Sequence, residues 1–535
     1  MEQKTRWLEH LKEKYFSGMS NVFFLTGNIG DYAVPGKMMI DYLVEELEKM
    51  GMEKVYTYNY STGRTLRKGE RGNASAVDYN DDWRQMLSDL SVSRGKLAYI
   101  VEYPEFLVPK ASNGYLDEPT KMRLIDLHQT MNNRSFVTSD HILILVSEVK
   151  SNIHDMFLTS TSRLYPITIE FPSEQERYNM IHYLKETSQK RIRWEIDERQ
   201  FSQLTAGLSL LHIEDLYLMS EEQGVLNRKQ IMARKEELIK KEFGEIIEIF
   251  DTDGYSLEQF AGQDHIKAYH REAIIEPILS GDVSIVPKGV LYMGPPGTGK
   301  TYFAKCFAGE AGMNFVEFKM SKILDKYVGE AERNLEKAFN AFRSLAPVGI
   351  FVDEIDQALS RGDNDTTSVT RNLFGMFLAF LSEPSHRGKI VWIGATNYPN
   401  KLDEALKRAG RFDKKMPFLP PNQEERKGVL SIHLKKMNYP FDVKDYDGFA
   451  EKTDGYSQAE IESVVIKALE VAKRKGHPEV NDEVLQFALD CMMSYQNEGV
   501  KNMTEIALRE CNDMEFLPKE YRKEVDQQIR RSRMG

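Results

Sequence analysis

Residues 294–301 read Gly-Pro-Pro-Gly-Thr-Gly-Lys-Thr and form a complete phosphate-binding P-loop pattern. The pattern requires a glycine, four free positions and then Gly-Lys-Ser/Thr, which Gly294 and residues 299–301 supply. The glycines let backbone N–H groups turn toward phosphate oxygens, while Lys300 adds a positive charge. The Thr301 hydroxyl is suited to Mg²⁺. The stretch therefore predicts a site for ATP with Mg²⁺.

The segments on either side of the P-loop have the expected patterns. Residues 289–293, Gly-Val-Leu-Tyr-Met, form a short apolar run typical of a buried strand. Residues 301–311 have a helical pattern, so bound phosphates would meet the N-terminus of a helix. Strand, loop and helix in this order predict a parallel α/β sheet.

An acidic partner for the P-loop follows at residues 348–354, Val-Gly-Ile-Phe-Val-Asp-Glu. An entirely apolar strand fits a parallel sheet that is covered on both faces, and ligands bind at the carboxyl ends of such strands. We expect Asp353 to hold Mg²⁺ and Glu354 to polarise the attacking water as a general base. Alone, a pair of acids at a strand end would be an ordinary solvated terminus.

Three further polar residues are candidates for catalysis. Asn397 follows the apolar run 390–396 and would reach the γ-phosphate or the attacking water, or else sit in a simple turn before Tyr398-Pro399. Arg408 and Arg411 end a short helical pattern. They are either surface charges or arginine fingers that act on the phosphates of a neighbouring subunit.

Composition limits the possible classes of protein. The chain has 535 residues, 41% hydrophobic and 29% charged, which predicts two to four globular domains. A net charge of −11 argues against nucleic acid or an anionic membrane as the default partner. None of the three cysteines lies in a CxxC pair, so neither a disulfide framework nor a zinc site is predicted. Without a signal-like N-terminus or an 18-residue apolar run, we expect a cytoplasmic protein.

The motifs follow one another in order from about Phe260 to Arg474, and this segment resembles an AAA ATPase domain of the Cdc48/katanin/proteasomal-ATPase type. In this resemblance, residues 294–301 are Walker A, residues 350–354 are Walker B and Asn397 is sensor 1. The paired arginine fingers are Arg408 and Arg411, the adenine-side loop is residues 260–263, the entry to the lid is residues 418–426 and the lid motif is residues 455–461.

The resemblance implies a set of site residues. The catalytic residues are Lys300, Glu354, Asn397, Arg408 and Arg411. The nucleotide contacts are Ala261, Gly262, Pro296, Gly297, Thr298, Gly299, Lys300, Thr301, Tyr302, Gln458 and Ala459. The Mg²⁺ ligands are Thr301 and Asp353. Two departures occur: Gln458 stands where the family usually has glycine, and residues 380–384 replace the usual Leu-Asp-Gly ending.

Residues 326–332, Lys-Tyr-Val-Gly-Glu-Ala-Glu, resemble the aromatic pore loop of the same family. The resemblance implies a hexameric ring in which Lys326, Tyr327 and Val328 grip a polypeptide without reading its sequence. A tyrosine beside a valine also packs into cores, but the neighbouring lysine and glycine favour an exposed loop.

The first half of the chain resembles the same architecture without its chemistry. Residues 21–30 form a strand that enters a glycine-bearing loop, but Asp31 replaces a needed glycine and Met38 replaces Ser/Thr. Tyr103 stands at the position of Glu354, and no pair of arginine fingers follows, Arg163 being a weak candidate. We expect a structural module that does not hydrolyse ATP and that presents substrate or binds an adaptor. The alternative is an unrelated α/β domain.

The predicted fold is α/β, with a P-loop AAA+ domain made of a parallel five-stranded sheet flanked by helices and a small helical lid, preceded by a degenerate AAA-like module. The predicted limits are 1–240 for the degenerate module, 241–259 for a linker, 260–415 for the large ATPase subdomain, 416–480 for the lid and 481–535 for a C-terminal helical extension.

The leading functional hypothesis is an ATP-dependent protein-remodelling motor: an unfoldase, a disassemblase or an assembly chaperone. It implies ATP and Mg²⁺, a homo-oligomeric ring, a protein substrate and no membrane partner. One alternative is a nucleic-acid-linked AAA motor, which the acidic charge and the aromatic loop disfavour. A second alternative is a nucleotide-gated scaffold ring with slow turnover. No His-Glu-x-x-His pattern occurs, so no built-in zinc protease is predicted.

Overall fold

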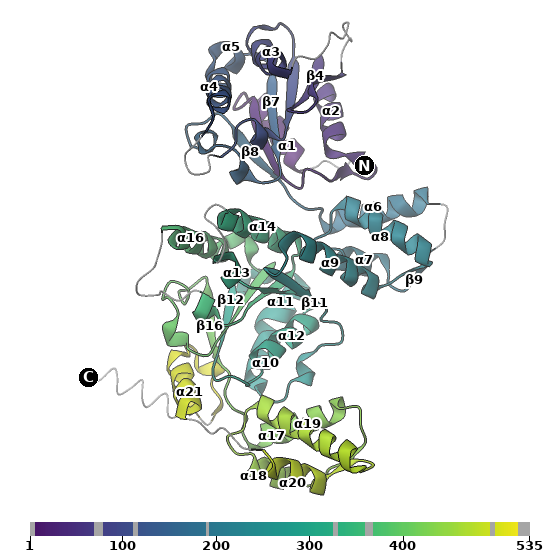
Figure 1. Cartoon of the computed structure of the whole chain (residues 1–535), viewed down its shortest axis with the longest axis vertical. Helices are drawn as coiled ribbons and strands as arrows, with labels where there is room; N and C mark the ends of the chain where they lie inside the picture. Colours follow the sequence, from purple (N-terminus) through teal and green to yellow (C-terminus); the bar gives the residue numbers. More distant parts are fainter. Residues whose placement is uncertain are drawn as a thin grey trace, which may run out of the picture. The chain divides into compact units, whose positions relative to one another are not determined.

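The computed structural model describes residues 6–68, 79–110, 116–188, 192–324, 330–358, 368–492, 498–519 and 521–522 (Figure 1). The chain divides into two compact units. One comprises Met1–Lys235 with Glu332–Ser344, and the other comprises Glu236–Ala331 with Leu345–Gly535. The predicted pore-loop residue Tyr327 lies outside the described residues.

The N-terminal unit contains a six-stranded sheet in the order β5-β4-β6-β7-β1-β8. All neighbours are parallel except β4 and β5, which form an antiparallel hairpin. The strands are β1 (Val22–Gly27), β4 (Lys54–Asn59), β5 (Gly63–Lys68), β6 (Leu97–Glu102), β7 (Ile142–Ser147) and β8 (Tyr165–Ile169).

Alternate side chains of these strands enter two separate cores. Phe23 and Leu25 pack with α1 (Arg6–Phe16) and α2 (Met39–Lys49) on one face of the sheet. Val22 and Phe24 pack on the other face with α3 (Tyr79–Val92), α4 (Glu118–Asn132) and α5 (Arg134–Val137). Because both faces are covered, the strands are apolar throughout instead of alternating with polar residues.

A helical subdomain follows this sheet. Its elements are α6 (Glu174–Thr187), β9 (Arg193–Trp194), α7 (Glu198–Leu204), α8 (Leu210–Gln223), β10 (Val225–Leu226) and α9 (Arg228–Phe243). The short strands β9 and β10 pair in parallel.

The second unit contains a six-stranded sheet in the order β11-β13-β14-β15-β12-β16. Five strands are parallel: β12 (Gly289–Met293), β13 (Asn314–Phe318), β14 (Val348–Val352), β15 (Ile390–Thr396) and β16 (Phe412–Pro417). The sixth, β11 (Ile247–Phe250), pairs antiparallel with β13. This edge strand lies inside the stretch that the sequence suggested as a linker, so we propose that the ATPase subdomain begins at residue 247.

Helices connect these strands in sequence. They are α10 (Asp264–His270), a π-helical turn (Arg271–Ile275), α11 (Glu276–Ser280), α12 (Lys300–Glu310), α13 (Ser321–Leu324), α14 (Glu330–Ser344), α15 (Ile355–Ala358) and α16 (Ser368–Ser382).

A helical lid follows β16. It consists of α17 (Gln423–Lys436), β17 (Phe441–Asp442), α18 (Tyr446–Lys452), α19 (Gln458–Lys475), β18 (Val480–Asn481) and α20 (Asp482–Asp490). Leu485 of α20 packs with Leu430 and Val465 in one core. We therefore propose that the lid extends to residue 490, beyond the limit suggested by the sequence. The last helix, α21 (Glu498–Glu510), returns to the sheet, where Glu510 pairs with Lys407 at 3.2 Å.

The predicted fold class is confirmed, and the two halves share one topology. When each antiparallel edge strand is set aside, β4-β6-β7-β1-β8 repeats as β13-β14-β15-β12-β16. The helix after each sheet starts with a capping box, formed by Ser173 with Glu176 in α6 and by Asn422 with Glu425 in α17. This repetition is what a degenerate second copy predicts.

Candidate functional site

The P-loop connects β12 to α12 and needs its glycines for steric reasons. Gly294 has φ 148°, and a Cβ atom there would lie 2.0 Å from the carbonyl oxygen of Phe418. Gly299 has φ 78°, and a Cβ atom there would lie 2.4 Å from Oε1 of Gln458. Only glycine accepts both the backbone angle and the close neighbour at these two positions.

Lys300 is the first residue of α12 and is buried within the loop. Its Nζ donates hydrogen bonds to the carbonyl oxygens of Gly294 and Pro295 at 2.8 Å each, and to Oδ1 of Asn397 at 2.9 Å. Burial lowers the pKa of Lys300 to about 8, although the carboxylates of Asp353 and Asp356 partly oppose that effect. The lysine is therefore held by neutral oxygens at the point where the P-loop pattern expects phosphates.

The carboxyl end of β14 places two acids beside the P-loop. The hydroxyl of Thr301 donates to Oδ2 of Asp353 at 3.2 Å, so the two expected Mg²⁺ ligands are neighbours. Both are hard oxygen donors, a pair that suits Mg²⁺ when phosphate and water oxygens complete its coordination. Glu354 is exposed and has φ 46°, a left-handed conformation that is rare for a non-glycine residue. Its backbone N–H donates to Oδ1 of Asp353 at 2.9 Å.

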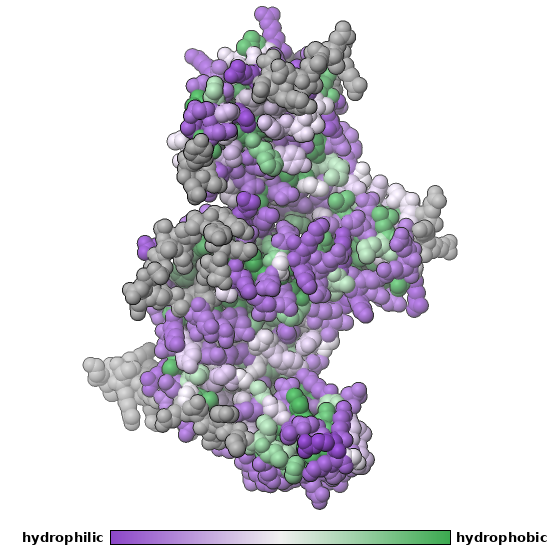
Figure 2. All heavy atoms as spheres, viewed as in Figure 1, coloured by the Kyte–Doolittle hydropathy of each residue, from purple (hydrophilic) through white to green (hydrophobic). Residues whose placement is uncertain are grey.

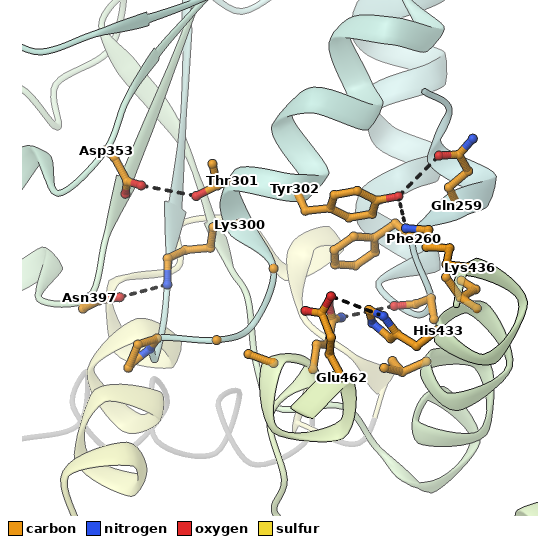
Figure 3. Close-up of a pocket in the computed structure, with 18 of the residues that line it drawn as sticks. Gln259, Phe260, Lys300, Thr301, Tyr302, Asp353, Asn397, His433, Lys436 and Glu462 are labelled. Atoms are coloured by element: carbon orange, nitrogen blue, oxygen red, sulfur yellow. Dashed lines mark hydrogen bonds and ion pairs between the residues drawn. The ribbon is translucent and has the colours of Figure 1, made fainter. Parts of the chain in front are cut away.

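Asn397 follows β15, the strand between β14 and β12, and its side chain meets Lys300 of the P-loop, while Asp353 meets Thr301 (Figure 3). The preceding Thr396 is buried and donates to Oδ1 of Asp356 at 2.6 Å. This buried bond fixes the end of β15 to the segment that follows the acidic strand end. No motif in the sequence indicated Asp356 as a residue of this site.

The lid encloses the other side of a pocket of about 430 Å³. The amide of Gln458 donates to the carbonyl oxygen of Ala261 at 3.3 Å, and the N–H of Ala459 donates to the carbonyl oxygen of Gly297 at 3.1 Å. The lining contains Gln259, Phe260, Ala261, Pro296, Gly297, Gly299, Lys300, Thr301, Tyr302, Asp353, Glu354, Asn397, Val429, Ile432, His433, Lys436, Gln458, Ala459 and Glu462.

Two predicted nucleotide contacts stand behind this lining. Thr298 is fully buried, and its hydroxyl donates to the carbonyl oxygen of Pro295 at 2.9 Å. Gly262 has φ 81° and faces the carboxylate of Glu425. Both residues shape the loops that form the pocket, while their direct contact with nucleotide remains a prediction.

One face of α17 lines the pocket, and its residues were not among those predicted from the sequence. Its pocket residues recur at helical spacing: Val429, Ile432, His433 and Lys436. Burial lowers the pKa of His433, whose Nδ1 lies 3.6 Å from Oε1 of Glu462. The Lys436 ammonium lies 4.1 Å from the centroid of the Tyr302 ring. The helical period was visible in the sequence, but nothing in it indicated that this face meets a pocket.

The two predicted arginine fingers are not part of the described pocket lining. Arg408 is exposed. Arg411 is half-buried, and its guanidinium donates to Oγ of Ser382 at 2.9 Å and to the carbonyl oxygen of Ala405 at 2.6 Å. The predicted pore-loop residues Lys326, Tyr327 and Val328 lie outside the described part of the chain.

The corresponding loop of the N-terminal unit contains a buried carboxylate that bonds to α8. Gly27 approaches the Ile169 carbonyl oxygen as Gly294 approaches that of Phe418, so the two loops start alike. Four residues later stands Asp31, which is 2% exposed. Its Oδ2 accepts from the N–H of Leu210 at 2.9 Å and its Oδ1 accepts from that of Leu211 at 2.8 Å, both in the first turn of α8.

A P-loop, an acidic strand end, an adjacent asparagine and an enclosing helical lid define an ATPase of the P-loop class. A family model described as "ATPase family associated with various cellular activities (AAA)" matches residues 290–419. Two more, "AAA+ chaperone, N-terminal Rossmann-like domain" and "AAA+ chaperone, second helical domain", match residues 3–170 and 175–244. The predicted resemblance to the AAA ATPases is thus confirmed for residues 290–419, and the two segments before them match domains of AAA+ chaperones.

Named relatives agree with this assignment. The cell division cycle protein 48 homolog of Archaeoglobus fulgidus is 36% identical over 230 residues, which are 42% of this chain and 31% of the relative. Proteasome-activating nucleotidase 2 of Haloferax volcanii is 36% identical over 261 residues, 47% of this chain and 63% of the relative. This chain spans about a third of the length of the Archaeoglobus protein. The expectation of an ATP hydrolase is confirmed at the level of the family.

Among the described residues, no helix combines the length and apolar character needed to cross a membrane.

Proposed function

We propose that this chain is an ATP-driven protein-remodelling motor that works as a homo-oligomeric ring. One observation carries the proposal: a single pocket joins Lys300, Asp353, Glu354 and Asn397, whereas the described lining includes neither Arg408 nor Arg411. A site that has its own base and phosphate-binding groups, but whose family arginines lie elsewhere, needs a neighbouring subunit to complete it.

The residues of the pocket have distinct roles in this proposal. Lys300 exchanges its carbonyl partners for phosphate oxygens, and the pocket bounded by Ala261, Tyr302 and Gln458 holds the adenine. Thr301 and Asp353 would hold Mg²⁺, and the ion would supply positive charge to the β- and γ-phosphates. Glu354 accepts a proton from the attacking water, while Asn397 orients that water or the γ-phosphate.

The lid connects hydrolysis to movement. Gln458 and Ala459 begin α19 and contact the adenine-side loop and the P-loop. A nucleotide between these elements would set the orientation of α17 and α19, and its loss would release them. In the ring, that rotation would move Lys326, Tyr327 and Val328 along a bound polypeptide. A cytoplasmic location and an adaptor at the N-terminal unit belong to the same proposal.

The first test is the solution mass of the Glu354→Gln variant with and without Mg-ATP, measured by light scattering. The substitution removes the general base but keeps the fold and the phosphate-binding groups, so ATP should remain bound. A rise to about six subunits with Mg-ATP supports the ring and the trans arginines together.

Lys300→Ala is the matched control, because it should lose the ATP-dependent rise in mass together with ATP binding. A Glu354→Gln protein that binds ATP but stays monomeric at high concentration would sink the ring mechanism for the isolated chain.

A further inference from the structure

The segment before β16 contains a buried ion pair that the ATP pocket does not explain. Hydrophilic side chains cover most of the visible face of the molecule (Figure 2), so exposed ion pairs are ordinary on this surface and stabilise the fold little. Lys407 differs, because its side chain is only 4% exposed. Its Nζ lies 3.2 Å from Oε2 of Glu510, the last residue of α21, and the two residues stand 103 positions apart in the chain. The pair therefore ties a loop of the ATPase subdomain to the C-terminal helix.

The loop that contains Lys407 forms a series of turns over residues 402–411, instead of a helix or a strand. The backbone N–H groups of Leu406, Lys407 and Arg411 donate to carbonyl oxygens three residues earlier, so these bonds shape the loop without fixing it to the sheet. Leu406 is fully buried, whereas Arg408 is exposed. Lys407 stands between them, and a loop of this kind takes its position from such side-chain anchors. The position of Arg408 thus depends on how the preceding lysine is held.

The end of α21 is a firm point of attachment for that lysine. The helix packs against β16 (Figure 1). Directly after it, the side-chain amide of Asn512 donates to the carbonyl oxygen of Asp413 at 2.7 Å and accepts from the N–H of Lys415 at 3.0 Å. A few residues further, Phe516 is fully buried in the core of the subdomain. Glu510 is therefore held in place by contacts that do not involve Lys407.

Two carboxylates face the Lys407 ammonium, and they differ in what they can hold. Glu404 lies 2.7 Å away but is 79% exposed and belongs to the same loop, only three residues earlier. Glu510 is 25% exposed and belongs to another element. Burial acts to lower the pKa of Lys407, but the two carboxylates outweigh it and leave this pKa raised, so the lysine is charged. A buried ion pair seldom adds stability over apolar residues of the same size, and its best-attested use is to fix one arrangement.

We propose that Glu510 is a positioning residue for ATP hydrolysis, because through Lys407 it holds the loop that presents Arg408 to the neighbouring subunit. The inference rests on the proposed function, since Arg408 acts on phosphates only in the ring. It gives α21, which contributes no residue to the described pocket lining, an effect on the rate of hydrolysis in the adjacent subunit.

The test compares kcat for ATP hydrolysis with the affinity for ADP, measured by calorimetric titration, in the full-length protein. Glu510→Gln keeps the size of the side chain but removes the charge that holds Lys407. It should lower kcat about tenfold and leave the Kd for ADP unchanged, because displacing a group that acts only in the transition state costs rate and not ground-state binding. Glu505→Gln, at a carboxylate 65% exposed on the same helix, is the matched control and should keep the wild-type kcat.

The route through Arg408 is tested by combining substitutions. If Glu510 acts through this arginine, Glu510→Gln should lower kcat no further in protein that already carries Arg408→Ala. A residue that only stabilises the fold would lower kcat again in that background. The rise in solution mass with Mg-ATP, measured by light scattering in a Glu354→Gln background, should persist when Glu510→Gln is added.

Wild-type kcat in Glu510→Gln, while Arg408→Ala is impaired, overturns the inference and leaves the proposed motor standing. A further fall in kcat in the Arg408→Ala background, or loss of the rise in mass, also overturns it, because Glu510 would then act on the fold or on assembly. Failure of the proposed function gives a different result: Arg408→Ala itself then hydrolyses ATP like the wild type, and the inference falls with it.

Discussion

The two sheets of this molecule have the same strand order but close their phosphate loops in opposite ways. In the ATPase copy, the loop at Gly294 leaves room for phosphates and is approached by the backbone of Ala459. In the N-terminal copy, the Asp31 carboxylate holds the first turn of α8 directly. A fold can therefore keep its topology while a different group of the loop holds the first turn of the following helix, a carboxylate in one copy and a backbone carbonyl in the other.

Both copies also retain a buried arginine in the helical subdomain, and its contacts do not involve the phosphate loop. Arg177 and Arg426 are buried, and each donates from Nε to a carbonyl oxygen of the next helical segment, Ser202 at 2.8 Å and Ala450 at 2.9 Å. Such buried, charge-assisted bonds hold the first two helices of each helical subdomain together. The comparison shows that the orientation of the helices is fixed by packing, and that the nucleotide chemistry lies in a few residues at strand ends.

The largest expected difference between the copies concerns the arginines. Arg408→Ala should lower kcat for ATP hydrolysis about 10³-fold with little change in ATP affinity, because a trans arginine stabilises only the transition state. Arg163→Ala, the nearest candidate in the N-terminal copy, should leave steady-state hydrolysis unchanged.

Mixing two inactive variants sharpens this test. Subunits with Arg408→Ala keep an intact Glu354, and subunits with Glu354→Gln keep an intact Arg408, so a mixed ring should regain part of its activity. If mixing restores nothing although mixed rings form, Arg408 does not act across subunits.

The second difference lies at two equivalent positions with left-handed backbone: the ATPase copy has the proposed general base, Glu354, where the N-terminal copy has Tyr103. Glu354→Gln should lower the rate of ATP hydrolysis about 10²-fold or more while Mg-ATP still binds. Tyr103→Glu places a carboxylate at the matching position, yet no hydrolysis should appear in a Glu354→Gln background, since we expect the loop at Asp31 to hold no phosphate. Hydrolysis measured in that double variant would break the comparison.

The third prediction places an aspartate in the P-loop of the ATPase copy, at the position that corresponds to Asp31. Thr298 stands four residues after Gly294, as Asp31 stands four residues after Gly27. Thr298→Asp should weaken ATP binding about 10²-fold, because a carboxylate in the loop repels the phosphates. Calorimetric titration gives the affinity, and Thr298→Ser, which keeps the bonded hydroxyl, should bind nearly normally.

The fourth prediction removes the N-terminal carboxylate. Asp31→Ala leaves the buried N–H group of Leu210 and the partly buried one of Leu211 without their acceptor, at a cost of about 2 kcal/mol. Hydrogen exchange at the start of α8 should then quicken about 30-fold. Asp140→Ala, at a carboxylate 65% exposed on the same unit, should not change exchange there. Unchanged protection in Asp31→Ala would mean that packing alone holds α8.

The smallest expected effect is a pH dependence confined to the ATPase copy. Phosphate binding needs protonated Lys300, and burial lowers the pKa of this lysine to about 8 in the protein without nucleotide. ATP affinity should therefore be constant at lower pH and fall about fivefold from about pH 8 to about pH 9, with proton uptake on binding. The same depressed pKa makes the folded state gain stability as pH rises above about 8, because the unfolded chain then binds more protons. Any ATP binding that remains in Lys300→Ala should not show this fall in affinity between about pH 8 and about pH 9.

The sequence predicted what is encoded in contiguous stretches. Residues 294–301, Asp353 and Asn397 stood out because strand, loop and polar residue follow each other directly, and the structure brings them together in one pocket. His433 and Lys436 escaped notice because their role depends on how α17 packs, which no local pattern states. Asp31 was read as a missing glycine, while its bonds to α8 join residues about 180 positions apart.

The Asp31 carboxylate also has a consequence for regulation. A ligand that is part of the chain has an effective concentration that no change in cellular ATP can alter. Occupancy of the ATPase pocket, by contrast, follows free nucleotide by mass action. The contact between the first loop and α8 is thus independent of free nucleotide, whereas we expect the contact between the P-loop and α19 to follow it.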